Sequence, residues 1–329
     1  MIGTRTPFRI SFAGGGSDLK EFYRRHPGCV LSTTINRYMY IFVHRFFDER
    51  IQVKYAKTEL VDSARQISHP IVREALCRFG ITGIDINVIA DVPAGTGLGS
   101  SGAFTVGLLN ALHAYGGRRP AREALAREAC EIEIEILNEP IGKQDQYAAA
   151  YGGLNFILFH PDDTVAVEPV VMPEEKYREL EKNLLFFYLG RPRAARDILA
   201  QQQRNLLSDR PVFERVKRMA DLARQLKDRL TAGDLQDVGM ILDENWNLKK
   251  ELSRKISDDQ IDHYYDVAKK NGAGGGKLLG AGGGGFLMFY CESEHQEKVR
   301  RSLGDLREYS FKFTRQGTSV IFNADSESV

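Results

Sequence analysis

The stretch "PAGTGLGSSGAF", from Pro93 to Phe104, places glycine at three alternate positions and follows them with two serines. Glycine has no Cβ, so it adopts positive φ easily and lets main-chain N–H groups approach a ligand closely. A helix is expected to start at the serines, and the N-terminus of a helix attracts anions. The stretch therefore predicts a loop that binds the phosphates of a nucleotide. Its candidate residues are Pro93, Gly95, Gly97, Leu98, Gly99, Ser100, Ser101 and Gly102.

The alternative interpretation is a glycine-rich turn in which Ser100 or Ser101 only caps the following helix. Two common nucleotide loops do not fit. A P-loop needs Gly-x4-Gly-Lys-Ser/Thr, and its nearest candidate, residues 271–278, starts with asparagine and ends with leucine. A protein-kinase loop needs His-Arg-Asp and Asp-Phe-Gly motifs downstream, which the sequence lacks.

The dinucleotide pattern Gly-x-Gly-x-x-Gly does match residues 97–102. That site also requires a second strand, ending in an acidic residue about 20 residues further on, which binds the ribose. Here the chain enters another predicted helix at Pro120 instead. A dinucleotide-dependent oxidoreductase stays open as an alternative that would bind NAD(H).

The composition argues against several classes of partner. The chain has 329 residues, of which 43% are hydrophobic and 27% charged, and its net charge is +1, so no strong field favours nucleic acid or an acidic membrane. The four cysteines form no Cys-x-x-Cys pair and no His-Glu-x-x-His occurs, which disfavours a disulfide framework or a zinc site. No apolar run is long enough for a signal peptide or a membrane span. We predict a cytoplasmic protein, a monomer or a homodimer, that acts on a small molecule.

The first half of the chain mixes strand and helix signals irregularly. A helix is expected over 69–80, with Pro70 near its start and Gly80 after its end, and another over 101–117. Segments rich in β-branched and aromatic residues, or alternating between apolar and polar residues, predict strands. These segments are 7–13, 37–47, 51–56 and 83–92.

Residues 120–140 are ambiguous, because their Glu-Ile-Glu-Ile-Glu-Ile run has the period of a strand. Alanine, arginine, glutamate and leucine dominate the segment, however, and Pro120 suits a first helical turn. We therefore predict a helix. Its apolar face is expected to consist of Leu125, Ala129, Ile132 and Ile136.

The sequence pattern changes from about Glu174 onward, where long charged amphipathic helices are expected. A chain of this length favours two domains over one. We place the boundary between residues 160 and 180, and predict domains at 1–170 and 171–329. Both halves mix helices and strands without a regular alternation, which predicts an α+β fold. The expected helices of the second half are 211–230, 234–252 and 257–272.

Two further glycine-rich segments complete an ordered set of three. "RISFAGGGSD" (Arg9–Asp18) precedes the 93–104 stretch, and "KLLGAGGGGF" (Lys277–Phe286) follows it. With this set the chain resembles, over nearly its whole length, the GHMP kinases, which include galactokinase, homoserine kinase and mevalonate kinase. The resemblance implies ATP and Mg²⁺ as cofactors. It also implies a two-domain architecture, with an N-terminal ATP-binding domain like domain 2 of ribosomal protein S5 and a ferredoxin-like C-terminal domain.

The same resemblance implies the catalytic residues. "GKQDQ" (142–146) resembles the Gly-x-x-Asp-Gln of sugar kinases in this family, which makes Asp145 the implied catalytic base. Whether Asp145 removes the proton early, or mainly orients the hydroxyl and stabilises charge, stays open. Arg9 is equivalent to an arginine near that aspartate, which would keep the carboxylate ionised and offset the charge of the transferred phosphoryl group.

For the metal, the resemblance implies Ser101 and a glutamate on the expected helix before Pro140. Glu133 lies seven residues before that proline, the family's spacing, and at the edge of the predicted apolar face. Glu131 and Glu135 point elsewhere on a helix. Glu133 and Ser101 are therefore the predicted Mg²⁺ ligands.

The first and third motifs imply the acceptor pocket. Paired polar groups of this kind suit a sugar, because each buried hydroxyl needs a partner. The implied residues are Gly15, Gly16, Ser17, Asp18, Gly282 and Gly283. Within the family, residues 13–23, 30–43 and 142–155 look most like kinases that phosphorylate the anomeric hydroxyl of D-glycero-D-manno-heptose 7-phosphate. Such an acceptor needs a cationic pocket for its 7-phosphate. The candidates are Lys20, Arg24, Arg25, Lys143, Arg191, Arg193 and Arg196.

Two alternatives within the same fold stay open. Another sugar-1-kinase, for galactose, fucose or unphosphorylated heptose, would not need that cationic pocket. A binding-only relative that senses sugar and nucleotide would be favoured by loss of the catalytic aspartate. The sequence keeps Asp145, Arg9 and Ser101, which favours an enzyme.

Overall fold

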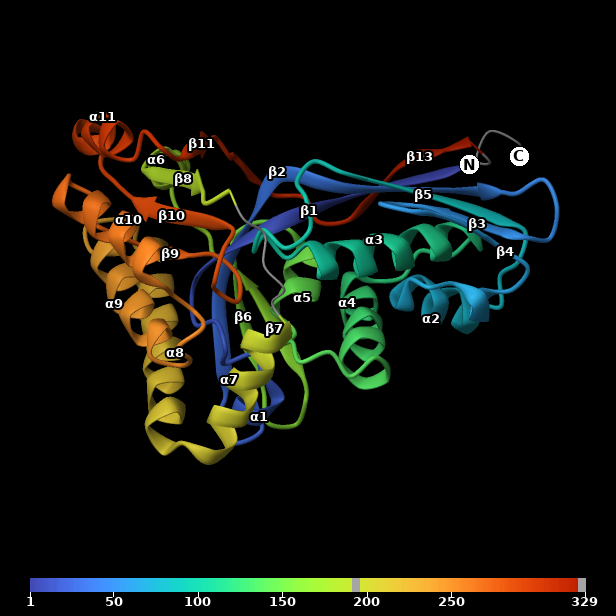
Figure 1. The fold of residues 1–329 in the computed structure, drawn as a ribbon, viewed down its shortest axis with the longest axis horizontal. Helices are drawn as coiled ribbons and strands as arrows, with labels where there is room; N and C mark the ends of the chain where they lie inside the picture. The colour runs from blue at the N-terminus through green and yellow to red at the C-terminus, as the bar shows by residue number, and fades with distance from the viewer. Residues whose placement is uncertain (191–195, 325–329) are drawn as a thin grey trace.

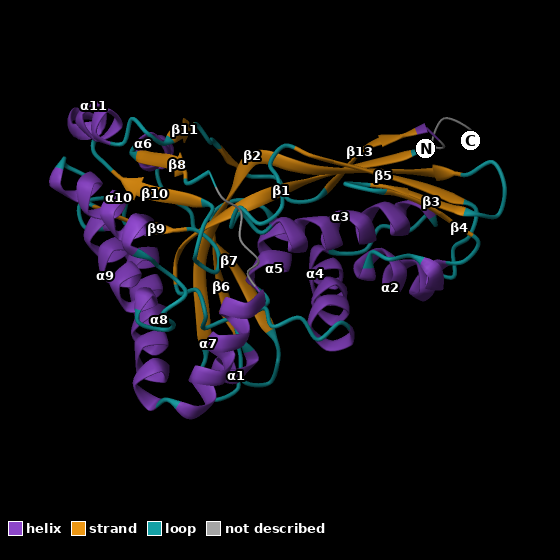
Figure 2. Ribbon diagram, viewed as in Figure 1, coloured by secondary structure: helices purple, strands orange, loops and turns teal. Residues whose placement is uncertain are grey.

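The computed structural model describes residues 1–190 and 196–324 (Figure 1). Within these residues the chain forms a nine-stranded sheet and a separate four-stranded sheet, with helices packed against both (Figure 2). The α+β prediction is confirmed. No helix of the described residues is both long and apolar enough to cross a membrane.

The first part of the chain supplies most of the nine-stranded sheet and the helices α2, α3 and α4, which lie on one side of it (Figure 1). Its strands are β1 (Ile2–Ala13), β2 (Gly28–Arg45), β3 (Ile51–Lys54), β4 (Thr58–Val61), β5 (Ile84–Ala90), β6 (Asn155–Phe159) and β7 (Val165–Pro169). Its helices are α1 (Lys20–Tyr23), α2 (Pro70–Phe79), α3 (Ser100–Tyr115), α4 (Arg122–Cys130) and α5 (Gln144–Tyr151), with a short 3-10 turn at Ala64–Gln66. All of the predicted strands and helices of this half are found here.

The second part forms the antiparallel four-stranded sheet, in the order β11-β8-β10-β9, and a group of long helices beside it (Figure 2). Its helices are α6 (Glu174–Lys182), α7 (Arg196–Ser208), α8 (Arg210–Thr231), α9 (Val238–Lys250), α10 (Asp259–Lys270) and α11 (Ser293–Ser302). Its strands are β8 (Leu184–Tyr188), β9 (Gly275–Leu278), β10 (Phe286–Tyr290) and β11 (Arg307–Tyr309). The three predicted amphipathic helices correspond to α8, α9 and α10.

The last two strands return to the first sheet. β12 (Phe313–Thr314) pairs with β2, and β13 (Ser319–Asn323) pairs with β1, with Ile2 opposite Asn323. The start of β1 and the end of β13 therefore lie together at one end of the long sheet (Figure 1). The division into 1–170 and 171–329 stays a prediction, and any such division leaves these two strands on the sheet of the first part.

Helix α3 is fixed tightly against β1, and this contact positions the functional site. Its residues from Gly102 to Leu112 are all buried, as expected for a helix that is apolar on every side. The hydroxyl of Thr4 donates a hydrogen bond to the carbonyl of Gly107 at 3.0 Å, and a Cβ on Gly107 would lie 2.7 Å from Thr6 Oγ1. The start of α3 is therefore held at a fixed place relative to the strand that carries Arg9.

The ambiguous Glu-Ile run is helical, as predicted, but it forms a π-helical turn at Glu131–Ile136 that continues α4. In this turn the N–H of Leu137 bonds the carbonyl of Ile132, five residues earlier, at 3.0 Å. A π turn contains more residues than an α turn and shifts the side chains that follow it around the axis. The prediction that Ile136 belongs to the apolar face is therefore wrong: its side chain is 45% exposed, and Ile134 is buried instead.

Candidate active site

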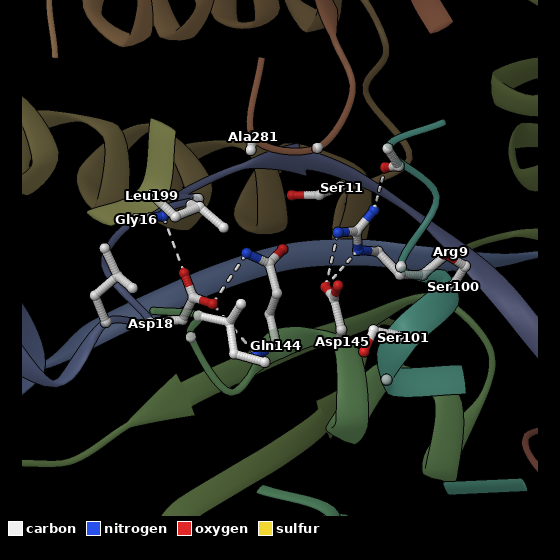
Figure 3. Close-up of a pocket in the computed structure, with 18 of the residues that line it drawn as sticks. Arg9, Ser11, Gly16, Asp18, Ser100, Ser101, Gln144, Asp145, Leu199 and Ala281 are labelled. Carbon is white, nitrogen blue, oxygen red and sulfur yellow. Dashed lines mark hydrogen bonds and ion pairs between the residues drawn. The ribbon is translucent and has the colours of Figure 1, made fainter. Parts of the chain in front are cut away.

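A cavity of about 370 Å³ lies where the three glycine-rich segments meet (Figure 3). Gly15 and Gly16 line it from the first segment, and Gly280 and Ala281 from the third. The second segment contributes Gly95, Gly97, Gly99, Ser100, Ser101 and Gly102. The structure thus brings together, around one space, residues that are up to 272 positions apart in the chain, from Arg9 to Ala281.

The loop before α3 has the backbone that a phosphate-binding loop needs. Gly95, Gly97 and Gly99 all have positive φ, at 78°, 85° and 75°, which disfavours any other residue. The loop leads directly into the N-terminus of α3, whose first N–H groups have no partners within the helix. Two predicted residues do not line the cavity. Pro93 is exposed beside it, and Leu98 is buried, with its carbonyl accepting a hydrogen bond from the Arg9 N–H at 3.0 Å.

Gly97 also makes the contact between the second and third segments. A Cβ at Gly97 would clash with the main-chain carbonyl of Leu279, whereas a Cβ at Gly117, which also has positive φ, would meet no atom within 4 Å. We expect Gly97→Ala to lower both the melting temperature and the affinity for ATP more than Gly117→Ala does. Both changes share a backbone strain of about 1–2 kcal/mol, so the difference isolates the contact. Thermal unfolding and calorimetric ATP titration of the two variants measure this difference, and equal effects of the two substitutions would contradict the prediction.

Arg9 and Asp145 form an ion pair inside the cavity (Figure 3). Nε and Nη2 of Arg9 both lie 2.7 Å from Oδ1 of Asp145, and Nη1 donates to the carbonyl of Gly97 at 2.6 Å. Asp145 lies in the first turn of α5, and a Cβ on Gly102 would lie 2.7 Å from the Cβ of Asp145. The missing side chain at Gly102 therefore allows this carboxylate to approach the start of α3.

The predicted metal ligands also meet. Ser101 Oγ donates a short hydrogen bond to Oε2 of Glu133, and the amide of Gln146 donates to Oε1 at 2.8 Å. Glu133 is fully buried, and burial raises the pKa of its carboxyl although these hydrogen bonds oppose the shift. Glu131, two residues earlier, is exposed and bonds Arg78 instead.

One carboxylate and one hydroxyl are a sparse donor set. Within the described ranges, no group of three or more histidine, cysteine, aspartate or glutamate side chains could hold a metal ion. Mg²⁺ in phosphoryl-transfer sites is characteristically bound by one or two protein oxygens, water and the phosphates of the substrate. Ser101 and Glu133 therefore fit Mg²⁺ and would not hold a metal that needs a full set of protein ligands.

The opposite end of the cavity is lined by polar side chains around Asp18 (Figure 3). Oδ1 of Asp18 accepts a hydrogen bond from the N–H of Gly16 at 2.9 Å, and Oδ2 accepts one from Nε2 of Gln144 at 3.0 Å. Burial raises the pKa of this carboxyl, which the hydrogen bonds partly offset. Oε1 of Gln144 and Oγ of Ser11 are buried and have no partner among the described residues. These two atoms are left for a polar ligand.

Several predicted acceptor residues do not line the cavity. The hydroxyl of Ser17 is fully buried and lies 2.7 Å from the carbonyl of Gly14 and 2.8 Å from that of Cys29, so it stabilises the turn. The N–H of Gly283 bonds the carbonyl of Ile256, and a Cβ on Gly282 would touch the same residue. The third segment reaches the cavity through Gly280 and Ala281 instead.

Most candidates for a 7-phosphate pocket have other partners. Lys143 and Arg24 both bond Asp163, at 2.7 and 2.6 Å. Arg196 pairs with Glu139 at 3.2 Å, and none of these lines the cavity. Arg25 donates to the carbonyl of Leu206 at 3.1 Å and stacks on Phe213. Arg191 and Arg193 lie outside the described residues.

The structure adds cavity residues that sequence reasoning missed. Gln202 from α7 and Lys249 from α9 line the cavity, and both are buried. Neither stands in a motif, and Lys249 reads in the sequence as part of a charged helix. Lys277 is the first residue of the third motif, and this position in the sequence could have indicated that it lines the cavity. The other missed residues are Ser11, Leu19, Ala94, Ile141, Gly142, Gln144, Leu199, Gly280 and Ala281.

Comparisons with known proteins show the family to which the chain is similar. Residues 50–153 match the family described as GHMP kinases N terminal domain, and residues 219–306 that described as GHMP kinases C terminal. A D-glycero-alpha-D-manno-heptose 7-phosphate kinase from Campylobacter jejuni is 30% identical over 333 residues, covering 96% of this chain and 97% of that protein. A galactokinase from Pyrococcus furiosus is 24% identical and covers 95% of each chain. A crystal structure of a D-glycero-D-manno-heptose 1-phosphate kinase from Bacteroides thetaiotaomicron has a TM-score of 0.80 and 27% identity, covering 99% of this chain and 100% of that chain.

The fold is that of a phosphotransferase, and in its cavity the glycine-rich loop before α3 faces a carboxylate and a group of polar side chains. The chain belongs to the GHMP kinase family. It is a kinase that acts on the hydroxyl group of a sugar, and ATP is the phosphoryl donor of this family. The two-domain GHMP kinase architecture predicted from the sequence is confirmed.

Proposed function

We propose that this kinase transfers the γ-phosphoryl group of ATP to the anomeric hydroxyl of D-glycero-D-manno-heptose 7-phosphate and so produces the 1,7-bisphosphate. The observation that carries the chemistry is the Arg9–Asp145 pair, which lies in the same cavity as the phosphate-binding loop and the unpartnered polar atoms near Asp18. The choice of acceptor is supported by the 30% identity to the Campylobacter enzyme over nearly the whole chain.

In the proposed mechanism, Asp145 accepts a hydrogen bond from the acceptor hydroxyl and then its proton, or orients it while charge develops. Arg9 holds the Asp145 carboxylate in place through Nε and Nη2 and directs positive charge toward the transferred phosphoryl group. The glycine loop and the N-terminus of α3 hold the other phosphates. Ser101 and Glu133 would hold Mg²⁺, which would neutralise negative charge on the phosphates when bound. The protein contributes positioning and electrostatics, and forms no covalent intermediate.

The acceptor pocket is proposed to lie between Asp145 and Asp18. Gln144 and Ser11 offer buried polar atoms that no described residue satisfies. A sugar hydroxyl at each of them would remove the cost of an unpaired buried polar group, about 1–3 kcal/mol each. An acceptor that lacks these hydroxyls leaves that cost in place, so the pocket is expected to select polyhydroxylated molecules.

A second candidate is a sugar-1-kinase for a neutral sugar, such as galactose, fucose or unphosphorylated heptose. One observation favours it: Arg24, Lys143 and Arg196 already have acidic partners and do not line the cavity. The galactokinase from Pyrococcus furiosus is 24% identical over 95% of the chain. Under either candidate we propose a cytoplasmic protein, a monomer or a homodimer, without a nucleic-acid or membrane partner.

A panel of acceptors with ATP and Mg²⁺ tests both candidates. The panel contains heptose 7-phosphate, unphosphorylated heptose, galactose and fucose, and ADP release gives kcat/KM for each. We expect heptose 7-phosphate to give the highest value, and ³¹P NMR to place the new phosphate on the anomeric carbon. An equal or higher kcat/KM for a neutral sugar selects the second candidate. If none of the four acceptors leads to release of ADP, and the protein binds NAD(H), the results would support the dinucleotide interpretation instead.

A further inference from the structure

Two lysines line the cavity in addition to the residues already described. Lys249 projects from the last turn of α9 and is 7% exposed, while Lys277 lies on β9 and is 2% exposed. A buried ammonium group is costly unless a negative charge or several acceptors stabilise it. Lysine is therefore rarely buried in a cavity wall without a function.

Neither lysine forms an ion pair within the part of the chain that the structure describes. Lys249 donates a short hydrogen bond to the carbonyl of Gly280 and a longer one, of 3.5 Å, to the carbonyl of Leu278. Lys277 donates a hydrogen bond to the carbonyl of Phe12 at 3.2 Å. Burial and the neighbouring Arg9 act against protonation of both lysines. The charge of Lys249 also acts against protonation of Lys277, while Asp18 favours protonation of Lys249. Burial and Arg9 lower the pKa of Lys249 to about 7. Three cationic side chains thus converge on one cavity, where they repel each other.

The position of Lys249 relates it to the nucleotide. Its partner Gly280 packs against the phosphate-binding loop, since a Cβ on Gly280 would lie 2.5 Å from the Cα of Gly97. Arg9 bonds the carbonyl of that same Gly97 through Nη1. The ammonium of Lys249 and the guanidinium of Arg9 are therefore anchored on two glycines in direct contact, at the junction of the second and third segments.

We propose that Lys249 and Lys277 form, with Arg9, an anion site that receives the γ-phosphoryl group of ATP from the side opposite to Ser101 and Glu133. The three cations would share the equatorial oxygens of the group as it passes to the acceptor, where preorganised charge is most effective. A phosphate group on the acceptor has the same chemistry and is the alternative ligand for this anion site. The contact of Gly280 with the phosphate-binding loop favours the nucleotide. The inference deepens the proposed function, because the γ-phosphoryl group is the one transferred.

The test compares Lys249→Met and Lys277→Met with Lys250→Met in the full-length protein. Methionine keeps the length of the chain and removes the charge. Lys250 is the next residue of α9, is partly exposed and bonds Asp262, so it is a matched control. Calorimetric titration with ADP and with the non-hydrolysable β,γ-imido analogue of ATP, both with Mg²⁺, requires no acceptor and so stays informative even if the proposed acceptor is wrong.

We expect Lys249→Met and Lys277→Met to lose at least about tenfold in affinity for the imido analogue and less than about twofold for ADP, since a charged hydrogen bond contributes about 1.5–3 kcal/mol. Lys250→Met should match the wild type with both. Binding of the analogue above pH 7 should also take up protons in the wild type, seen as a dependence of the heat on buffer, and fewer in Lys249→Met, where only Lys277 is left to be protonated. Equal losses for ADP and the analogue, or none, would overturn the proposal. So would a rise in KM for heptose 7-phosphate alone, which would assign the site to the acceptor.

A purely structural role for Lys249 makes the opposite prediction for stability. If its bonds to Gly280 and Leu278 mainly hold the third segment, Lys249→Met should unfold at a lower temperature. If the charge is kept for function, its removal should raise the melting temperature, because an uncompensated buried charge is lost. The gain should be larger at pH 7 than at pH 9, since Lys249 loses its proton on folding and the cost of that loss falls as the pH approaches the ordinary pKa of 10.5.

Discussion

Asp145→Asn is expected to lower kcat by about 10²–10⁴-fold, the usual contribution of a positioned acid–base group, while the affinity for ATP changes little. Asparagine has nearly the same shape, so it still occupies the space left open by Gly102. It can neither accept the hydroxyl proton nor balance the charge of Arg9. Arg9 keeps its hydrogen bond to the carbonyl of Gly97, which should preserve the phosphate-binding loop.

Three measurements on Asp145→Asn separate catalysis from folding. Circular dichroism checks the fold, calorimetry gives the affinity for ATP, and ADP release gives kcat. Asp259→Asn, at an exposed position in the first turn of α10, is the control and should leave all three unchanged. A kcat for Asp145→Asn within a few-fold of the wild type would remove Asp145 from the proposed mechanism. A matching loss of ATP affinity would instead assign it to nucleotide binding.

The conformation of the glycine-rich loop before α3 could be predicted from the sequence because its requirement is local. Gly95, Gly97 and Gly99 have to adopt positive φ whatever the rest of the chain does, and only glycine does so without strain. The start of α3 after these glycines is likewise a local signal. The proximity of Arg9 and Asp145 was predicted only from the resemblance to a family, because no spacing along the chain indicates their 2.7 Å contact.

The acceptor side of the cavity was predicted less well, because it depends on contacts between distant elements. Ser17 and Gly283 stand in motifs, but their polar groups bond main-chain atoms of the turns they form. Gln202 and Lys249 come from α7 and α9, where polar residues are ordinary on an exposed helix face. Only the packing of these helices over the first motif turns both side chains into the cavity.

The sequence indicated which of the three glutamates is buried, but it did not predict the turn that buries it. A regular helix places Glu133 at the edge of the face that includes Ile132 and Ile136, so the sequence pointed to the buried residue. The π turn then buries Glu133 completely and leaves Ile136 exposed. A bulge of this kind depends on a hydrogen bond that slips by one residue, and residue propensities do not encode it.

Glu133→Gln is expected to raise the Mg²⁺ concentration for half-maximal activity by at least about tenfold, the scale at which loss of a supporting group affects a metal site. The amide oxygen of glutamine can still accept the hydrogen bond from Ser101, but it carries no charge for the cation. The amide of glutamine cannot also accept the hydrogen bond that Gln146 donates to Glu133, but burial already raises the pKa of Glu133, so loss of the buried charge offsets part of this cost and the melting temperature should fall only slightly. Glu131→Gln and Glu135→Gln lie on the same turn with exposed side chains and serve as matched controls.

The comparison of the three glutamine variants tests the geometry of the π turn as well as the metal. If the turn directs one glutamate inward, only Glu133→Gln shifts the Mg²⁺ titration, and high Mg²⁺ restores part of its activity. An equal shift in all three variants would mean that their summed charge attracts the ion without a defined ligand. An unchanged titration for Glu133→Gln would leave Ser101 and the phosphates as the metal's anchors, and would make Glu133 a buried support for Ser101 and Gln146.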